Sequence, residues 1–72
     1  MRLSNRIRNV RVAYNLTQSD LADKMHISAS TYGKMERNAN HSKYDTLSKI
    51  AEEIGVSLLF LLDTENKNNT PI

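Results

Sequence analysis

Two short helical segments joined by a turn, between Leu16 and Asn38, constrain the fold more than any other feature of this chain. The first segment opens on Thr17, an N-cap residue, and Asp20 follows three residues later in the position of a capping box. The second opens on Ser28, another N-cap residue, and apolar residues follow it at helical spacing. This order predicts two helices packed against each other across a tight turn.

Three further helices are predicted around this pair, and the segment 39–43 is expected to be irregular. For a first helix over about residues 3–14, the inward residues are expected to be Leu3, Ile7, Val10 and Tyr14. For a later helix that ends at Gly55, they are expected to be Leu47, Ile50, Ala51 and Ile54. Ser57 caps a short fifth helix with the sequence LLFLL.

The chain has 72 residues, the size of one small domain. We expect an all-α domain over residues 1–62 and a disordered tail over residues 63–72, where few side chains can be buried. The chain has no cysteine and no apolar run long enough for a signal peptide or a membrane span. A cytoplasmic protein that does not bind membranes is therefore expected.

Neither catalysis nor metal binding is predicted. His26 and His41 have no cysteine, third histidine or i, i+4 partner beside them, and the chain has no nucleophile–base pair or phosphate loop. We therefore expect no enzyme, no metal and no cofactor. The 10 Lys and Arg residues exceed the 8 Asp and Glu residues, an excess that favours a polyanion only where it gathers on one face.

The stretch from Leu3 to Leu62 resembles the Cro and C1 repressor family of compact, five-helix, lambda-repressor-like DNA-binding domains. The order of the elements carries the resemblance, together with the motifs Thr17-Gln18, Leu21-Ala22, Ile27-Ser28, Met35-Glu36-Arg37 and Ile54-Gly55-Val56-Ser57. It implies a helix-turn-helix whose second helix enters the major groove of double-stranded DNA.

The helix after Ser28 would present its outward residues to DNA bases, and by spacing these are Ala29, Ser30, Gly33 and Lys34. Phosphate contacts are expected, with Gln18 as the first candidate, from Thr17, Gln18, Ser28, Thr31, Asn38 and Lys43. Gly33 reads no base by itself. It either allows a close approach to DNA or is a tolerated substitution.

Arg11 and Glu36 are candidates for an ion pair, because such residues pair across the domain in the resembling repressors. The alternative is two separate surface charges. The chain departs from the family at His26 and Asn38, where glycines are common, so both residues are expected to have positive φ. Tyr32 is expected to be a core ring with its hydroxyl at the edge.

The fifth helix is apolar on all sides, and a monomer of this size can cover only one of them. A homodimer is predicted, with Leu59, Phe60 and Leu62 at its interface and with Leu58, Leu61 and Leu62 shared between interface and core. The predicted function is a sequence-specific transcriptional regulator, a dimeric repressor of a palindromic operator. The alternative is an antitoxin-like or other interaction module that holds an unidentified protein partner, with DNA binding secondary.

Overall fold

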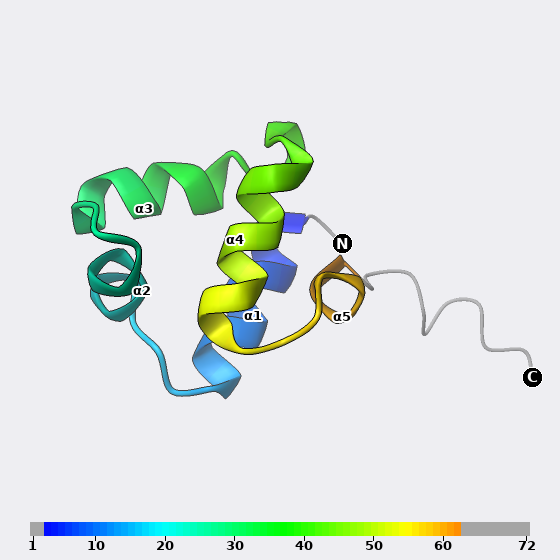
Figure 1. Cartoon of the computed structure of the whole chain (residues 1–72), viewed down its shortest axis with the longest axis horizontal. Coiled ribbons are helices and arrows are strands. Elements are labelled where there is room, and N and C mark those ends of the chain that lie inside the picture. Colours follow the sequence, from blue (N-terminus) through cyan, green and yellow to red (C-terminus); the bar gives the residue numbers. More distant parts are fainter. Residues whose placement is uncertain (1–2, 63–72) are drawn as a thin grey trace, which may run out of the picture.

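The structure, a computed structural model, describes residues 3–62, and the predicted tail lies outside them. The elements in chain order are α1 (Leu3–Ala13), α2 (Gln18–Met25), α3 (Ala29–Arg37), the 3-10 helix η1 (Ala39–His41), α4 (Tyr44–Ile54) and α5 (Leu58–Leu62). Figure 1 shows α4 crossing in front of α1, with α2 and α3 on one side and α5 on the other. The five predicted α-helices are therefore present.

The predicted caps define where the helices begin. The hydroxyl of Thr17 accepts a hydrogen bond from the amide of Asp20 at 2.9 Å, and the Asp20 carboxylate accepts one from the amide of Thr17 at 2.8 Å. The hydroxyl of Ser28 accepts from the amide of Thr31 at 3.1 Å, and that of Ser57 accepts from the amide of Phe60 at 3.0 Å. Each cap satisfies an amide that has no partner inside its own helix.

Left-handed residues end three of the helices. Asn15 and His26 both have φ 61°, and Gly55 has φ 98°, so the predictions of a positive φ at His26 and of a helix end at Gly55 are confirmed. The prediction for Asn38 is wrong, because its φ is −98°. The chain turns directly from α3 into η1 at Asn38, so no left-handed residue is needed there.

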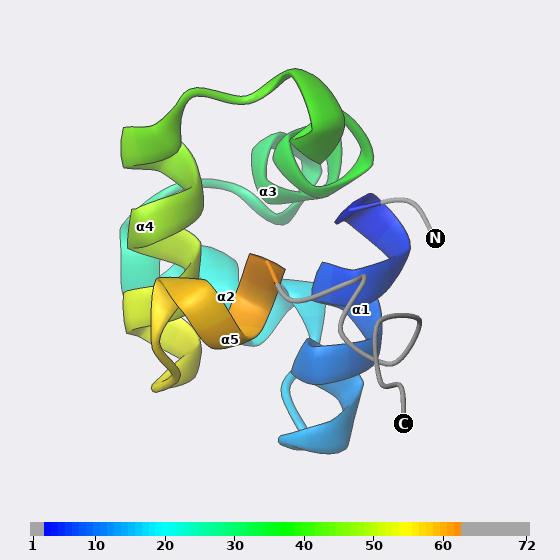
Figure 2. The ribbon, with the colours of Figure 1, turned by 90° about the vertical axis from the view of Figure 1, so that its right-hand side faces the viewer.

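The core lies between α1, α2, α4 and α5, with α3 closing it from the side of α2. Figure 2 shows α5 between α1 and α4, and Leu61 of α5 is fully buried there. The segment after α3 is more ordered than predicted, because it forms η1 and buries Ala39. Tyr14 was expected to face inward, but it lies beyond the end of α1 and is half exposed.

Two polar contacts fasten α1 to distant parts of the chain. The amide of Leu3 donates to Asn40 Oδ1 of η1 at 2.9 Å, which satisfies one free amide at the start of α1. The Arg6 guanidinium lies 4.8 Å from the centre of the Phe60 ring and donates to the Phe60 carbonyl. Within residues 3–62, no helix is long and apolar enough to cross a membrane.

Candidate nucleic-acid interface

The helix α3 forms an outer edge of the molecule, with α2 packed beside it (Figure 1). Three of the four residues predicted to contact bases, Ala29, Ser30 and Lys34, have exposed side chains on α3. Of these, Ser30 can donate or accept a hydrogen bond and Lys34 can donate to guanine O6 and N7. The exposed surface of α3 therefore has two small side chains in its first turn, one of them polar, and a long basic side chain nearer its end.

Gly33 does not face outward as predicted, because it is buried on the side of α3 that faces α2. A Cβ atom at Gly33 would lie 3.4 Å from Oε1 of Gln18 and 3.6 Å from Nη1 of Arg37. Both distances are van der Waals contacts. The space beside Gly33 is therefore filled by two long polar side chains of the same molecule. This packing is a third explanation for the glycine, beside the two that the sequence suggested.

The residues expected to contact phosphates differ in how exposed they are to solvent. Thr17, Ser28, Thr31, Asn38 and Lys43 are exposed, whereas Gln18 is half-buried. The hydroxyls of Thr17 and Ser28 already accept from the amides that they cap. Gln18 donates from Nε2 to Oε1 of Glu36 at 3.0 Å, which leaves its second amide hydrogen for another acceptor.

A buried network around Glu36 holds α1, α2 and α3 together. Arg11 of α1 donates to both carboxylate oxygens, from Nε to Oε2 at 2.8 Å and from Nη2 to Oε1 at 3.3 Å. The Tyr32 hydroxyl donates to Oε2 at 3.0 Å, and Gln18 of α2 donates to Oε1. Arg11 is 8% exposed and Glu36 is 4% exposed, so the predicted ion pair is confirmed and desolvated. The network sets the orientation of α3 on α1 and α2.

Two side chains in this region have shifted pKa values. Burial, and then the neighbouring Glu36 carboxylate, raise the pKa of Tyr32, so its hydroxyl remains a donor at neutral pH. The Tyr32 ring is a core residue as predicted, but its hydroxyl belongs to the buried network. The amide of Thr17, and then its hydroxyl, lower the pKa of Asp20 below its ordinary 3.8, so the capping carboxylate is ionised at neutral pH.

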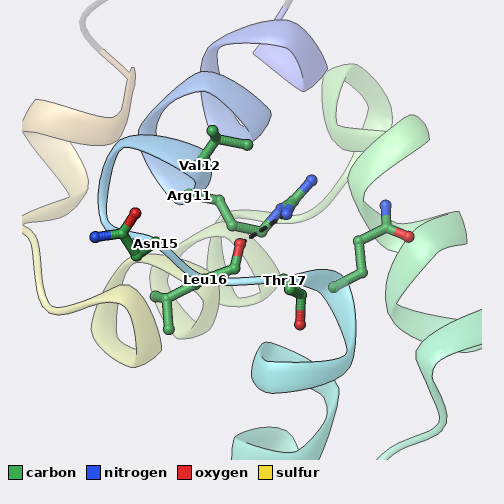
Figure 3. A pocket seen from close by; sticks show the side chains of 6 residues that line it. Arg11, Val12, Asn15, Leu16 and Thr17 are labelled. Atoms are coloured by element: carbon green, nitrogen blue, oxygen red, sulfur yellow. Dashed lines mark hydrogen bonds between the residues drawn. The ribbon is translucent and has the colours of Figure 1, made fainter.

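The loop before α2 is fastened by the same arginine. Arg11 donates from Nη1 to the Leu16 carbonyl at 2.8 Å, the bond drawn as a dashed line in Figure 3. Around it is a shallow hollow of about 360 Å³, lined by Arg11, Val12, Asn15, Leu16, Thr17 and Gln18. One guanidinium therefore positions both α3, through Glu36, and the start of α2, through Leu16.

The exposed side of α5 is apolar, as the sequence predicted. Leu59 is 82% exposed and Phe60 is 45% exposed, whereas Leu62 is half-buried against the core. Leu61 belongs to the core alone rather than being shared with an interface. Two adjacent apolar side chains thus lie open on this helix.

Sequence reasoning missed three arginines. Arg6 stacks on Phe60, and Arg8 and Arg37 line one hollow between α1 and α3. Arg6 is far from Phe60 in the sequence, and Arg8 is far from Arg37, so sequence spacing does not indicate that the two residues of either pair lie close together. For Arg11, by contrast, the sequence does contain a signal. The i, i+4 spacing of Leu3, Ile7 and Arg11 places Arg11 near the inward side of its helix. Among residues 3–62, no group of three or more His, Cys, Asp or Glu side chains forms a candidate metal site.

Comparison with known proteins gives one family and two curated relatives. A family model described as helix-turn-helix matches residues 7–61. The chain is 34% identical over 58 residues to the cryptic phage CTXphi transcriptional repressor RstR of Vibrio cholerae serotype O1 El Tor, a match that covers 81% of this chain and 52% of that repressor. A second Vibrio cholerae RstR is 29% identical over 65 residues, with 90% and 59% covered. The chain thus spans little more than half the length of these relatives. No solved structure gave a significant match.

Proposed function

This chain belongs to the helix-turn-helix family, and from that membership we propose that it is a sequence-specific transcriptional repressor that binds a palindromic operator as a homodimer. It is a helix-turn-helix DNA-binding domain similar to a phage transcriptional repressor. That similarity supports repression as the regulatory outcome. The family is one of DNA-binding repressors and not of enzymes.

The observation that carries the proposal is that α3 is held in one orientation with part of its surface exposed. Arg11 and Gln18 both bond Glu36, so α1 and α2 hold one face of α3 while Ser30 and Lys34 stay exposed on another. A helix held in this way can enter the major groove with little loss of conformational entropy on binding. We assign base contacts to Ala29, Ser30 and Lys34, and phosphate contacts to Thr17, Gln18, Ser28, Thr31, Asn38 and Lys43.

We assign the homodimer interface to α5. The side chains of Leu59 and Phe60 are open to solvent, Leu62 adjoins them, and covering this apolar surface with the same surface of a second copy satisfies a two-fold axis. Such a dimer would set its two α3 helices about 34 Å apart, one turn of B-DNA. The cytoplasm is the compartment in which a repressor of this kind would act.

Selection of bound duplexes from a random DNA library, followed by sequencing, tests this function. The proposal expects a palindrome whose half-sites lie about one helical turn apart. Lys34→Ala and Ser30→Ala should change which bases are enriched, and Lys49→Ala, an exposed lysine on α4, should not. If no sequence is enriched and the protein instead purifies with a stoichiometric protein on α5, the interaction-module alternative replaces the repressor.

A further inference from the structure

A small hollow lies between the start of α1 and the end of α3. It has a volume of about 110 Å³ and is lined by Ser4, Asn5, Arg8, Glu36 and Arg37. Of these residues, Glu36 belongs to the buried network and Arg37 covers Gly33, whereas Ser4, Asn5 and Arg8 have no role in the site described above. Two of them are arginines from different helices, and both are exposed.

The charge of this hollow is positive. Within residues 3–62 the ion pairs are Arg11–Glu36 and Lys49–Glu53, so no carboxylate of that range neutralises Arg8 or Arg37. The Glu36 carboxylate also lines the hollow, but Arg11 neutralises it, and both of its oxygens already accept hydrogen bonds. The Arg8 and Arg37 guanidinium groups, which have no carboxylate partner among residues 3–62, form with the side chains of Ser4 and Asn5 a surface that attracts anions.

Arg37, which lines this hollow, also lies beside Gln18 of α2 over Gly33. Because Gly33 has no side chain, Nη1 of Arg37 and Oε1 of Gln18 lie within 3.6 Å and 3.4 Å of the position that its Cβ would take. The Gln18 amide points its Nε2 at Glu36, since a carboxylate can only accept a hydrogen bond. The side chains of Gln18 from α2, Arg37 from α3 and Arg8 from α1 therefore follow one another along one flank of α3, and the two arginines supply its positive charge.

We propose that this flank is a track for the DNA backbone, on which Arg37 and Arg8 bind successive phosphates beyond the one assigned to Gln18. This inference rests on the proposed function. The nine residues of α3 span about 14 Å, and a DNA strand carries a phosphate for about every 3.4 Å of helix axis. Several phosphates of one strand therefore pass such a flank, and α1 takes part in DNA binding as well as supporting α3.

The test measures affinity for the selected operator and for a scrambled duplex between about 50 and 200 mM salt. Arg8→Gln and Arg37→Gln should each reduce the slope of log K against log salt by about one, and the double variant by about two. Both duplexes should lose affinity by a similar factor, because phosphate contacts carry no sequence information. Arg37→Lys should retain the slope.

Lys49→Gln is the matched control, because it removes one exposed positive charge outside the flank and should leave the slope unchanged. Arg8→Gln and Arg37→Gln slopes equal to the Lys49→Gln slope, in a protein that binds DNA, would overturn the track and leave the proposed function intact. Absence of DNA binding by the wild-type protein would overturn the proposed function and this inference with it. Unchanged thermal unfolding of the two arginine variants would confirm that they report on binding and not on folding.

Discussion

Nε of Arg11 on α1 lies 2.8 Å from Oε2 of Glu36 on α3, although 25 positions separate the two residues. The pair is desolvated, and the same carboxylate also accepts from Tyr32 and Gln18. Buried ion pairs are tolerated when additional hydrogen bonds satisfy the charges, and this one has them. The ion pair therefore joins the stability of the fold to the orientation of the helix that we assign to DNA reading.

Removing either charge of this pair should destabilise the protein strongly. Arg11→Met and Glu36→Gln should each lower the free energy of unfolding by about 3 kcal/mol or more, because each leaves its partner charged, buried and unpaired. The double variant should lose clearly less than the sum of the two. Urea unfolding of the four proteins measures this, and additive losses would mean that the two charges do not act as a pair.

The Tyr32 hydroxyl should contribute separately. Tyr32→Phe keeps the buried ring and removes one donor to the Glu36 carboxylate, so the free energy of unfolding should fall by about 2 kcal/mol. Tyr44→Phe is the matched control, because Tyr44 is 69% exposed on α4 and should have little effect. Equal unfolding midpoints for the two variants would show that the hydroxyl adds nothing to the network.

Acid should weaken the start of α2 through Asp20. Its pKa is lower in the folded protein than its ordinary 3.8, so its stabilising effect is complete above pH 3.8 and is lost as the pH falls through the folded value. Asp20→Asn should therefore unfold at a lower temperature than the wild type at neutral pH. The two melting temperatures should converge as the pH falls below 3.8, and a difference that does not shrink with falling pH would contradict this assignment.

Local chemistry made the caps and ends predictable. Thr17, Ser28 and Ser57 bond amides within three residues, and Asn15 and His26 take the φ that their side chains tolerate, so sequence spacing contains the necessary information. Helical spacing placed Arg11 near the inward side of α1, whereas its pairing with Glu36 was predicted from the family resemblance. The contacts that sequence spacing did not predict join residues on different helices, and they depend on how those helices pack against each other.

Gly33 illustrates that limit. Its outward placement followed from counting positions along α3, but Gln18 and Arg37 cover it from α2 and from the last turn of α3. Two further predictions were wrong: that Tyr14 faces inward and that Asn38 has a positive φ. The helical pattern was extended one residue past the end of α1, and a family glycine was taken to require positive φ where this chain enters η1 instead.

Gly33→Ala should stabilise the protein. Glycine in a helix interior costs about 1 kcal/mol relative to alanine, and the added methyl group would make only van der Waals contact with Gln18 and Arg37. Its unfolding midpoint should rise. Gly33→Val adds two further methyl groups to that carbon and should instead displace the Gln18 amide from Glu36. If Gly33→Ala is less stable than the wild type, the space over Gly33 is tighter than these contacts indicate.

A substitution at Leu59 should show whether the protein forms a dimer through α5. It is 82% exposed, so Leu59→Lys removes little from the core and should leave the free energy of unfolding of the monomer nearly unchanged. At a two-fold interface, however, the same change places two lysines opposite each other, so sedimentation should move from dimer to monomer. Operator affinity should fall with it, because two linked α3 helices bind far more tightly than one.

Val12→Lys is the control for this experiment, because Val12 is an exposed apolar residue of α1 outside the predicted interface. It should leave both the sedimentation coefficient and the operator affinity unchanged. A wild-type protein that sediments as a monomer at micromolar concentrations, with or without operator DNA, would refute the α5 dimer. If Val12→Lys breaks the dimer and Leu59→Lys does not, the two copies meet through α1, and Leu59 and Phe60 are left for another protein.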